Sequence, residues 1–172
     1  MKKLLLLIAS LSLVLAACTE EKVEKKVTTT EGTETEEKSD VAGEMVKFYL
    51  SISQTINTVD DDLNAYEFTE EPTEAVELKK MRDAAKVAAA NAAVKVGELE
   101  VPAELKDQKV AIESALTKMQ ESYTMKSEAL AVEGKVDFDE AKAKFEEADA
   151  ELNKVLKEVG LAESSIAKEV LQ

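Results

Sequence analysis

Residues 137–160 read DFDEAKAKFEEADAELNKVLKEVG, and their apolar side chains recur at steps of three and four. This spacing places them on one stripe of a helix, whereas a strand would alternate at every second residue. The stripe consists of Phe138, Ala141, Phe145, Ala148, Leu152, Val155 and Val159. Asp137 and Glu140 have the spacing of a capping box. Gly160 accepts the left-handed conformation of a helix end, with Leu161 folding back onto the last turn. We therefore expect one amphipathic helix across this stretch.

The same helical period extends upstream to Asp40 and predicts three further helices, over residues 41–66, 72–99 and 101–130. The first stripe is formed by Val41, Met45, Phe48, Ile52, Ile56, Val59, Leu63 and Tyr66. Breaks of only a few residues separate the stripes. A short amphipathic tail, which includes Ile166, follows at the C-terminus.

Two lysines interrupt the apolar pattern of residues 101–130. Lys109 and Lys126 occupy positions where the strict period would place apolar groups. A lysine can lay its aliphatic stem along an apolar seam and keep its ammonium group in water. We expect both lysines to do so.

The pattern predicts an all-α fold, an antiparallel up-and-down bundle of about four helices over residues 40–172. Long segments with apolar stripes, joined by short connections, bury those stripes best against their neighbours in the chain. Two alternatives remain open at this point. One is a three-helix core with a fourth helix loosely attached, and the other is a set of long hairpins that complete their core by dimerising.

The N-terminus has the pattern of an export signal. Met1-Lys2-Lys3 is followed by an apolar run from Leu4 to Ala17 that only two serines interrupt. A basic end, a short apolar core and small residues before a cleavage point are typical of a secretory signal peptide. The run is too short to span a bilayer. We therefore expect residues 1–17 to be a signal peptide that is cleaved.

The run Leu15-Ala16-Ala17-Cys18 resembles the lipobox of bacterial lipoproteins. In that family the cysteine thiol receives a diacylglycerol, and after cleavage the cysteine becomes the first residue. The resemblance implies an extracytoplasmic protein that Cys18 anchors to the bacterial membrane. Residues 18–39 are almost entirely charged or hydroxylated, so we expect the lipidated cysteine and a flexible acidic tether there. The mature part resembles small helical-bundle lipoproteins.

Composition argues against several classes of function. The chain has 36 Asp and Glu against 22 Lys and Arg, a net charge of −14, which repels nucleic-acid phosphates and anionic lipid headgroups. It has no histidine, the usual general base and transition-metal ligand at neutral pH. Its single cysteine is assigned to the lipid anchor. We therefore expect no nucleic-acid binding, no cofactor, no metal site and no enzymatic activity.

One acidic stretch partly matches a calcium-binding loop. Acidic and amide side chains from Asp60 to Glu71 follow the spacing of the loop template, but Ala65 stands where a glycine turn is needed. Glu67 also stands where an aliphatic residue is usual. We therefore favour a position of Asp60 and Asp61 on the exposed side of the first helix over a calcium site.

Residues 84–93 are rich in alanine. Small side chains favour helix and allow a neighbouring helix to approach closely, which is one explanation of the cluster. The other is a shallow groove for a partner in the cell envelope. Because the surroundings are acidic, such a partner needs a basic amphipathic surface. Ala89 and Ala93 are the candidate partner-binding residues.

These observations predict a lipid-anchored, non-catalytic binding or structural module of the cell envelope. Two alternatives remain. The first is a ligand-binding or sensing lipoprotein with a pocket between helices. The second is a phage-type exclusion lipoprotein that blocks DNA entry at the membrane.

Overall fold

The computed structural model describes residues 31–69 and 74–170, and every regular element in these ranges is helical. The six α-helices are α1 (Glu31–Asn57), α2 (Asp61–Glu67), α3 (Ala75–Gly97), α4 (Lys109–Ala131), α5 (Asp139–Glu158) and α6 (Ile166–Val170). A short 3-10 helix, η1 (Ala103–Leu105), precedes α4. The all-α prediction is confirmed. The expected signal peptide and Cys18 lie outside the described residues.

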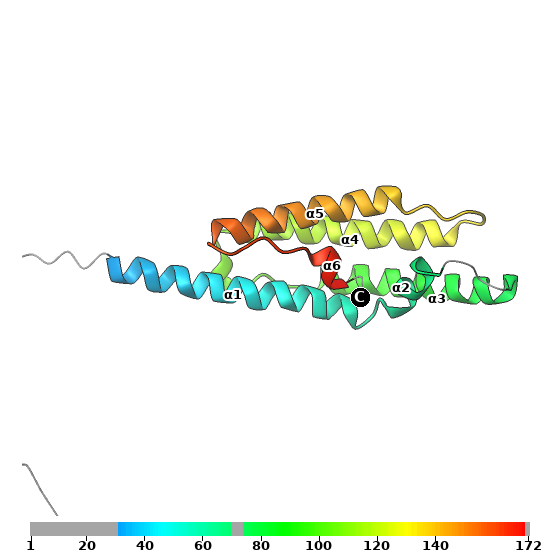
Figure 1. Cartoon of the computed structure of the whole chain (residues 1–172), viewed down its shortest axis with the longest axis horizontal. Helices are drawn as coiled ribbons and strands as arrows, with labels where there is room; N and C mark the ends of the chain where they lie inside the picture. Colours follow the sequence, from blue (N-terminus) through cyan, green and yellow to red (C-terminus); the bar gives the residue numbers. More distant parts are fainter. Residues whose placement is uncertain (1–30, 70–73, 171–172) are drawn as a thin grey trace, which may run out of the picture.

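The long helices α1, α3, α4 and α5 extend along the longest axis of the molecule (Figure 1). In that view α4 and α5 lie along the upper side, and α1 and α3 lie along the lower side. The short helices α2 and α6 lie near the middle. α4 packs extensively against both α3 and α5. α1 packs against α3, η1 and α6.

The first expected helix is divided in two, because α1 ends at Asn57 and α2 begins at Asp61. Thr58 and Val59 are β-branched and therefore weak helix formers. The Thr58 hydroxyl also donates to the Thr55 carbonyl at 2.7 Å, which favours a turn over a continued helix. Ile56 and Leu63, on either side of the turn, both face the core. The apolar period therefore continues across the break, so the sequence pattern does not reveal the turn.

The start of α1 differs from the expected domain boundary. The helix begins at Glu31, whereas the flexible tether was expected to reach residue 39. The last part of the expected tether is therefore helical in the structure. Four of residues 31–39 are glutamates, which are good helix formers, so the backbone continues the α1 helix without an apolar stripe of its own.

The core is built from small residues on α3 and larger ones on the other helices. α3 contributes four alanines with no exposed surface or almost none, Ala85, Ala88, Ala89 and Ala92. Large buried side chains come from α1, α4 and α5, and they include Ile52, Ile112, Met119, Leu152 and Val155. Because the side chains of α3 are short, α4 can pack closely against it.

Arg82, the only arginine, caps the C-terminal end of α4. Its Nε donates to the Leu130 carbonyl at 2.8 Å and its Nη1 to the Gly134 carbonyl at 3.0 Å. The last carbonyls of a helix have no partner within the helix, and a cation at that end also interacts favourably with the helix dipole. Arg82 therefore ties α3 to the turn between α4 and α5.

The end of α5 follows the sequence signal, but its start does not form the expected capping box. The Asp137 carboxylate accepts the backbone N–H of Asp139 at 2.9 Å, and Phe138, the residue that precedes the helix, makes no side-chain cap. At its end Gly160 has a φ of 82°, and the Leu161 N–H donates to the Leu156 carbonyl at 2.8 Å. This is the expected left-handed helix end.

Replacing a core leucine should cost far more stability than replacing a surface leucine. Leu152 has no exposed surface, so Leu152→Ala leaves a cavity and should lower the free energy of unfolding by about 2–5 kcal/mol. Leu50 is 44% exposed, and Leu50→Ala is the matched control, with an expected loss under about 1 kcal/mol. Urea denaturation followed by circular dichroism measures both. Equal losses would contradict the observed core.

Candidate functional site

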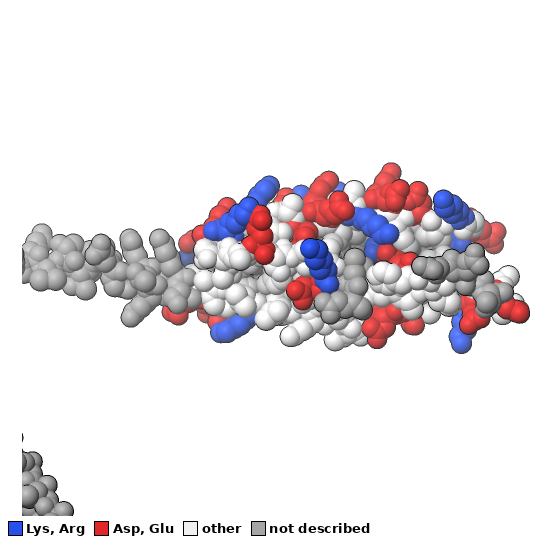
Figure 2. Space-filling view, in the orientation of Figure 1, with Lys and Arg blue, Asp and Glu red and all other residues white. Residues whose placement is uncertain are grey.

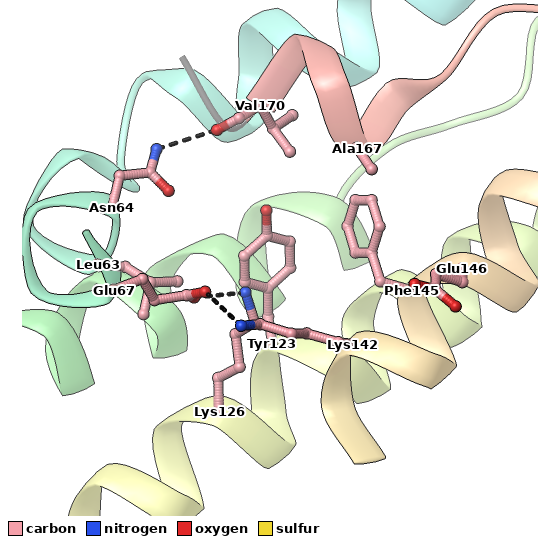
Figure 3. A pocket seen from close by; sticks show the side chains of 10 residues that line it. All are labelled: Leu63, Asn64, Glu67, Tyr123, Lys126, Lys142, Phe145, Glu146, Ala167 and Val170. Carbon is pink, nitrogen blue, oxygen red and sulfur yellow. Dashed lines mark hydrogen bonds and ion pairs between the residues drawn. The ribbon is translucent and has the colours of Figure 1, made fainter. Parts of the chain in front are cut away.

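A cavity of about 140 Å³ lies where α2, α4, α5 and α6 meet. Its lining residues come from each helix at steps of three or four, so each helix turns one face toward it. They are Leu63, Asn64 and Glu67 on α2, Tyr123 and Lys126 on α4, Lys142, Phe145 and Glu146 on α5, and Ala167 and Val170 on α6 (Figure 3). We refer to this cavity as the central pocket.

An ion pair forms one side of the central pocket. Lys126 Nζ lies 2.6 Å from Glu67 Oε1, and only 8% and 5% of the two side chains are exposed. Lys142 Nζ lies 3.6 Å from Glu67 Oε2, so one carboxylate contacts two ammonium groups, as Figure 3 shows. Lys126 Nζ also lies 5.6 Å from the ring centre of Tyr123 and 5.7 Å from that of Phe138. Cation–π attraction adds to its stabilisation.

The expectation that Lys126 keeps its charge in water is wrong. Its ammonium group is buried, because α2 places Glu67 directly against it. A buried ammonium group requires a paired and hydrogen-bonded environment, since losing water otherwise costs several kcal/mol. Lys109 remains half exposed, 3.6 Å from Glu113, as a surface lysine does.

Aromatic rings form the apolar wall of the central pocket. The rings of Tyr123 and Phe145 pack edge to face, with centroids 5.8 Å apart and planes at 88°. This is a favoured geometry for aromatic pairs, and it fixes both rings. Leu63 and Val170 complete the wall from α2 and α6. Most of the wall is therefore hydrocarbon.

Asn64 holds α6 over the pocket. Its Nδ2 donates to the Val170 carbonyl at 2.9 Å and to Asp60 Oδ2 at 3.2 Å. Asn57 Nδ2 donates to the Glu169 carbonyl at 3.0 Å. A five-residue helix has little stability of its own. The position of α6 therefore depends on these side-chain contacts and on the buried side chains of Ile166 and Val170.

Asp60 is a buried acid next to this network. It is 2% exposed, and burial raises the pKa of its carboxyl from 3.8 to about 6. The hydrogen bond from Asn64 and the positive charge of Lys126 act in the opposite direction on this pKa. Its backbone carbonyl accepts the N–H of Asn64 at 2.9 Å and so begins α2.

The two cations of the central pocket, Lys126 and Lys142, are both engaged by Glu67. Among the described residues no group of three or more acidic, histidine or cysteine side chains is placed to hold a metal ion. Glu71, the last residue of the calcium-loop match, lies outside them.

The candidate partner-binding residues do not form a surface. Ala89 has no exposed surface and Ala93 is 7% exposed, and both lie in the hydrophobic core. The expectation that they contact a partner is therefore wrong for the folded chain. α3 turns these alanines inward because the interior is the only place where a short side chain is needed for close helix packing. Cys18 lies outside the described residues.

Sequence analysis missed the central pocket. One signal was present, because Lys126 stands in an apolar register and a buried lysine needs an acidic partner. The partner, Glu67, is 59 residues away and lies just beyond the helix expected over residues 41–66. Neither its position nor that of Asn64 follows from local spacing.

No family model, no curated protein and no solved structure matches this chain.

Two tryptophan substitutions on α3 test whether its alanines face the core. Ala89→Trp inserts a large ring into a packed core and should lower the free energy of unfolding by about 1–3 kcal/mol or more. The adjacent Ala90 is exposed, so Ala90→Trp should change it by no more than about 0.5 kcal/mol. Urea midpoints compare the two variants. If Ala90→Trp lowered the free energy of unfolding and Ala89→Trp did not, the buried face of α3 would be the one that carries Ala90.

Asp60 should make the protein less stable at neutral pH than at acidic pH. Its folded pKa of about 6 exceeds its unfolded value of 3.8, so its contribution is fully present below pH 3.8 and is lost as the pH rises through 6. Asp60→Asn keeps an acceptor for Asn64 and removes the charge. It should raise the free energy of unfolding at pH 7 by roughly 1–3 kcal/mol and by almost nothing at pH 4.

The control for this prediction is Asp61→Asn, at an exposed neighbouring position. Urea denaturation at both pH values should show a change of no more than about 0.5 kcal/mol for it. A gain from Asp60→Asn that is the same at pH 4 and pH 7 would mean that burial of the Asp60 charge does not affect stability.

Proposed function

We propose that this chain is a lipid-anchored, extracytoplasmic binding or structural module of the bacterial cell envelope, without catalytic activity. The observation that carries the proposal is the run Leu15-Ala16-Ala17-Cys18 behind a short apolar segment. Two acyl chains on one cysteine hold a protein stably at a membrane, which one chain alone does not. No helix in the described part of the chain is both long and apolar enough to cross a membrane.

The surface charge does not favour attraction of the protein to anionic lipids. Figure 2 shows acidic side chains over the whole length of the drawn face, with lysines between them. The net charge is −14, and removal of a leader containing Lys2 and Lys3 makes it more negative still. An acidic surface is repelled by anionic headgroups. Membrane attachment therefore depends on the anchor.

We also infer that α1, α3, α4 and α5 form an antiparallel up-and-down bundle. The close packing of α3 against α4 and of α4 against α5 supports it, because helices joined by short connections become antiparallel neighbours. The connections cover residues 98–108, which include η1, and 132–138. α2 and α6 then cover one side of the bundle and line the central pocket.

The central pocket favours ligand binding over protein docking within this proposal. The alanines that a partner helix would need are buried, whereas the pocket is a preformed apolar cavity with a few polar groups. Such cavities between helices are the usual form of a small-molecule site. A ligand-binding or sensing lipoprotein is therefore the version of the proposal that the geometry supports best.

Membrane attachment should depend on Cys18. Cys18→Ala removes the only thiol that can accept a diacylglycerol, so the variant should accumulate as unprocessed precursor or be released from the membrane fraction. Ser12→Ala keeps the apolar segment and the cysteine, and it should stay anchored. Membrane fractionation with detection of lipid labelling measures both. A lipid-labelled, membrane-bound Cys18→Ala variant would refute the lipobox assignment.

A further inference from the structure

Two polar atoms at the central pocket have no hydrogen-bond partner among the described residues: the Tyr123 hydroxyl and the Asn64 side-chain oxygen. Both hydrogen bonds of the Asn64 side chain use its Nδ2, and the Tyr123 hydroxyl makes none within the described part of the chain. Tyr123 is 97% buried, since only 3% of it is exposed. Both residues line the pocket, so a ligand there can form hydrogen bonds with the two atoms without breaking a contact within the protein.

The Tyr123 hydroxyl is held as a donor aimed toward α6. Figure 3 shows the ring standing between α2 and α5 with its hydroxyl directed toward the side where Val170 and Ala167 lie. The edge-to-face contact with Phe145 fixes the ring. Burial raises the pKa of the Tyr123 hydroxyl, with the negative charges of Asp60 and Glu67 acting in the same direction, so the group keeps its proton.

The Asn64 side-chain oxygen is held as an acceptor. Both of its amide hydrogens are directed at fixed acceptors, the Val170 carbonyl and the Asp60 carboxylate. Rotating the amide by half a turn would place its oxygen against both acceptors, which is repulsive. The oxygen therefore keeps its orientation, and the pocket offers one donor and one acceptor.

The pocket is surrounded by charges of both signs. Glu67 is shared by Lys126 and Lys142, and Glu146 lies on α5 one turn beyond Lys142. Asp60 adds a further acid behind Asn64. An anion in the pocket would meet these carboxylates, and a cation would meet the two lysines. An uncharged ligand avoids both costs.

From the size, the apolar wall and this donor and acceptor, we infer that the central pocket binds a small uncharged alcohol or phenol with an apolar body of about the size of benzene. Its hydroxyl accepts from Tyr123 and has Asn64 as an acceptor nearby. The volume of about 140 Å³ is close to that of cavities that hold benzene. This inference rests on the proposed ligand-binding role and specifies its ligand class.

The test is a ¹⁹F NMR titration of the full chain in liposomes, with protein-free liposomes of the same composition as the blank. The probes are 4-fluorophenol and fluorobenzene, which lacks the hydroxyl. Tyr123→Phe removes only the donor, so 4-fluorophenol should bind about 5–10-fold more weakly, as the loss of one hydrogen bond predicts. Fluorobenzene should bind this variant and the unchanged chain equally. Equal 4-fluorophenol affinity for the two proteins would overturn the inference.

A second variant tests the location of the site without relying on Tyr123. Ala167→Leu adds bulk to the pocket wall and should reduce the binding of both probes at least tenfold, whereas Ala162→Leu, at an exposed position before α6, should leave both unchanged. Circular dichroism confirms that the variants are folded, and if Ala167→Leu is not, the Tyr123→Phe comparison decides. Undiminished binding to folded Ala167→Leu would place the probes elsewhere and refute the site.

Charged probes test the class of ligand. At neutral pH 4-fluorobenzoate should bind at least tenfold more weakly than 4-fluorophenol, and tighter binding of the benzoate would contradict an uncharged ligand. The anchor is tested separately, because loss of membrane attachment appears in fractionation and not in these titrations. A chain that is not lipidated would still bind 4-fluorophenol if the pocket inference is correct.

Discussion

The buried ion pair between Glu67 and Lys126 is the interaction on which the central pocket depends. In a dry environment each charge requires the other, because removing one partner leaves an uncompensated charge that costs several kcal/mol. The pair joins the end of α2 to the C-terminal part of α4 at 2.6 Å. With α2 held there, Leu63 and Asn64 face the pocket, and Asn64 in turn holds α6 through the Val170 carbonyl.

A second constraint is the packing of α3 against α4. Its buried face consists mainly of alanine, so the larger side chains of α4 fill the space between the helices. Arg82 connects the same two helices at one end by capping the carbonyls of α4. α4 is thus held on α3 by close packing and on α2 by a charge pair. It is the central element of the fold.

The distribution of charge follows from these constraints. The acids are mostly on the surface, where water solvates them. The few charged or polar groups that the fold buries, such as Lys126, Asp60 and Asn64, are clustered at the junction of α2, α4 and α6. Apolar packing alone does not fix the positions of helices as short as α2, with seven residues, and α6, with five. Directional polar contacts supply that specificity here.

The sequence by itself determined the helical class, the limits of α5 with Gly160 at its end, and most core positions, because these depend on local spacing and on glycine geometry. Only the tertiary structure decided that Ala89 and Ala93 face inward and that Lys126 is buried. Both depend on residues distant in the chain, because a small residue fits a surface as well as an interior and a buried lysine needs an acidic partner. The pairing of Lys126 with Glu67, 59 residues apart, exists only once α2 and α4 have packed.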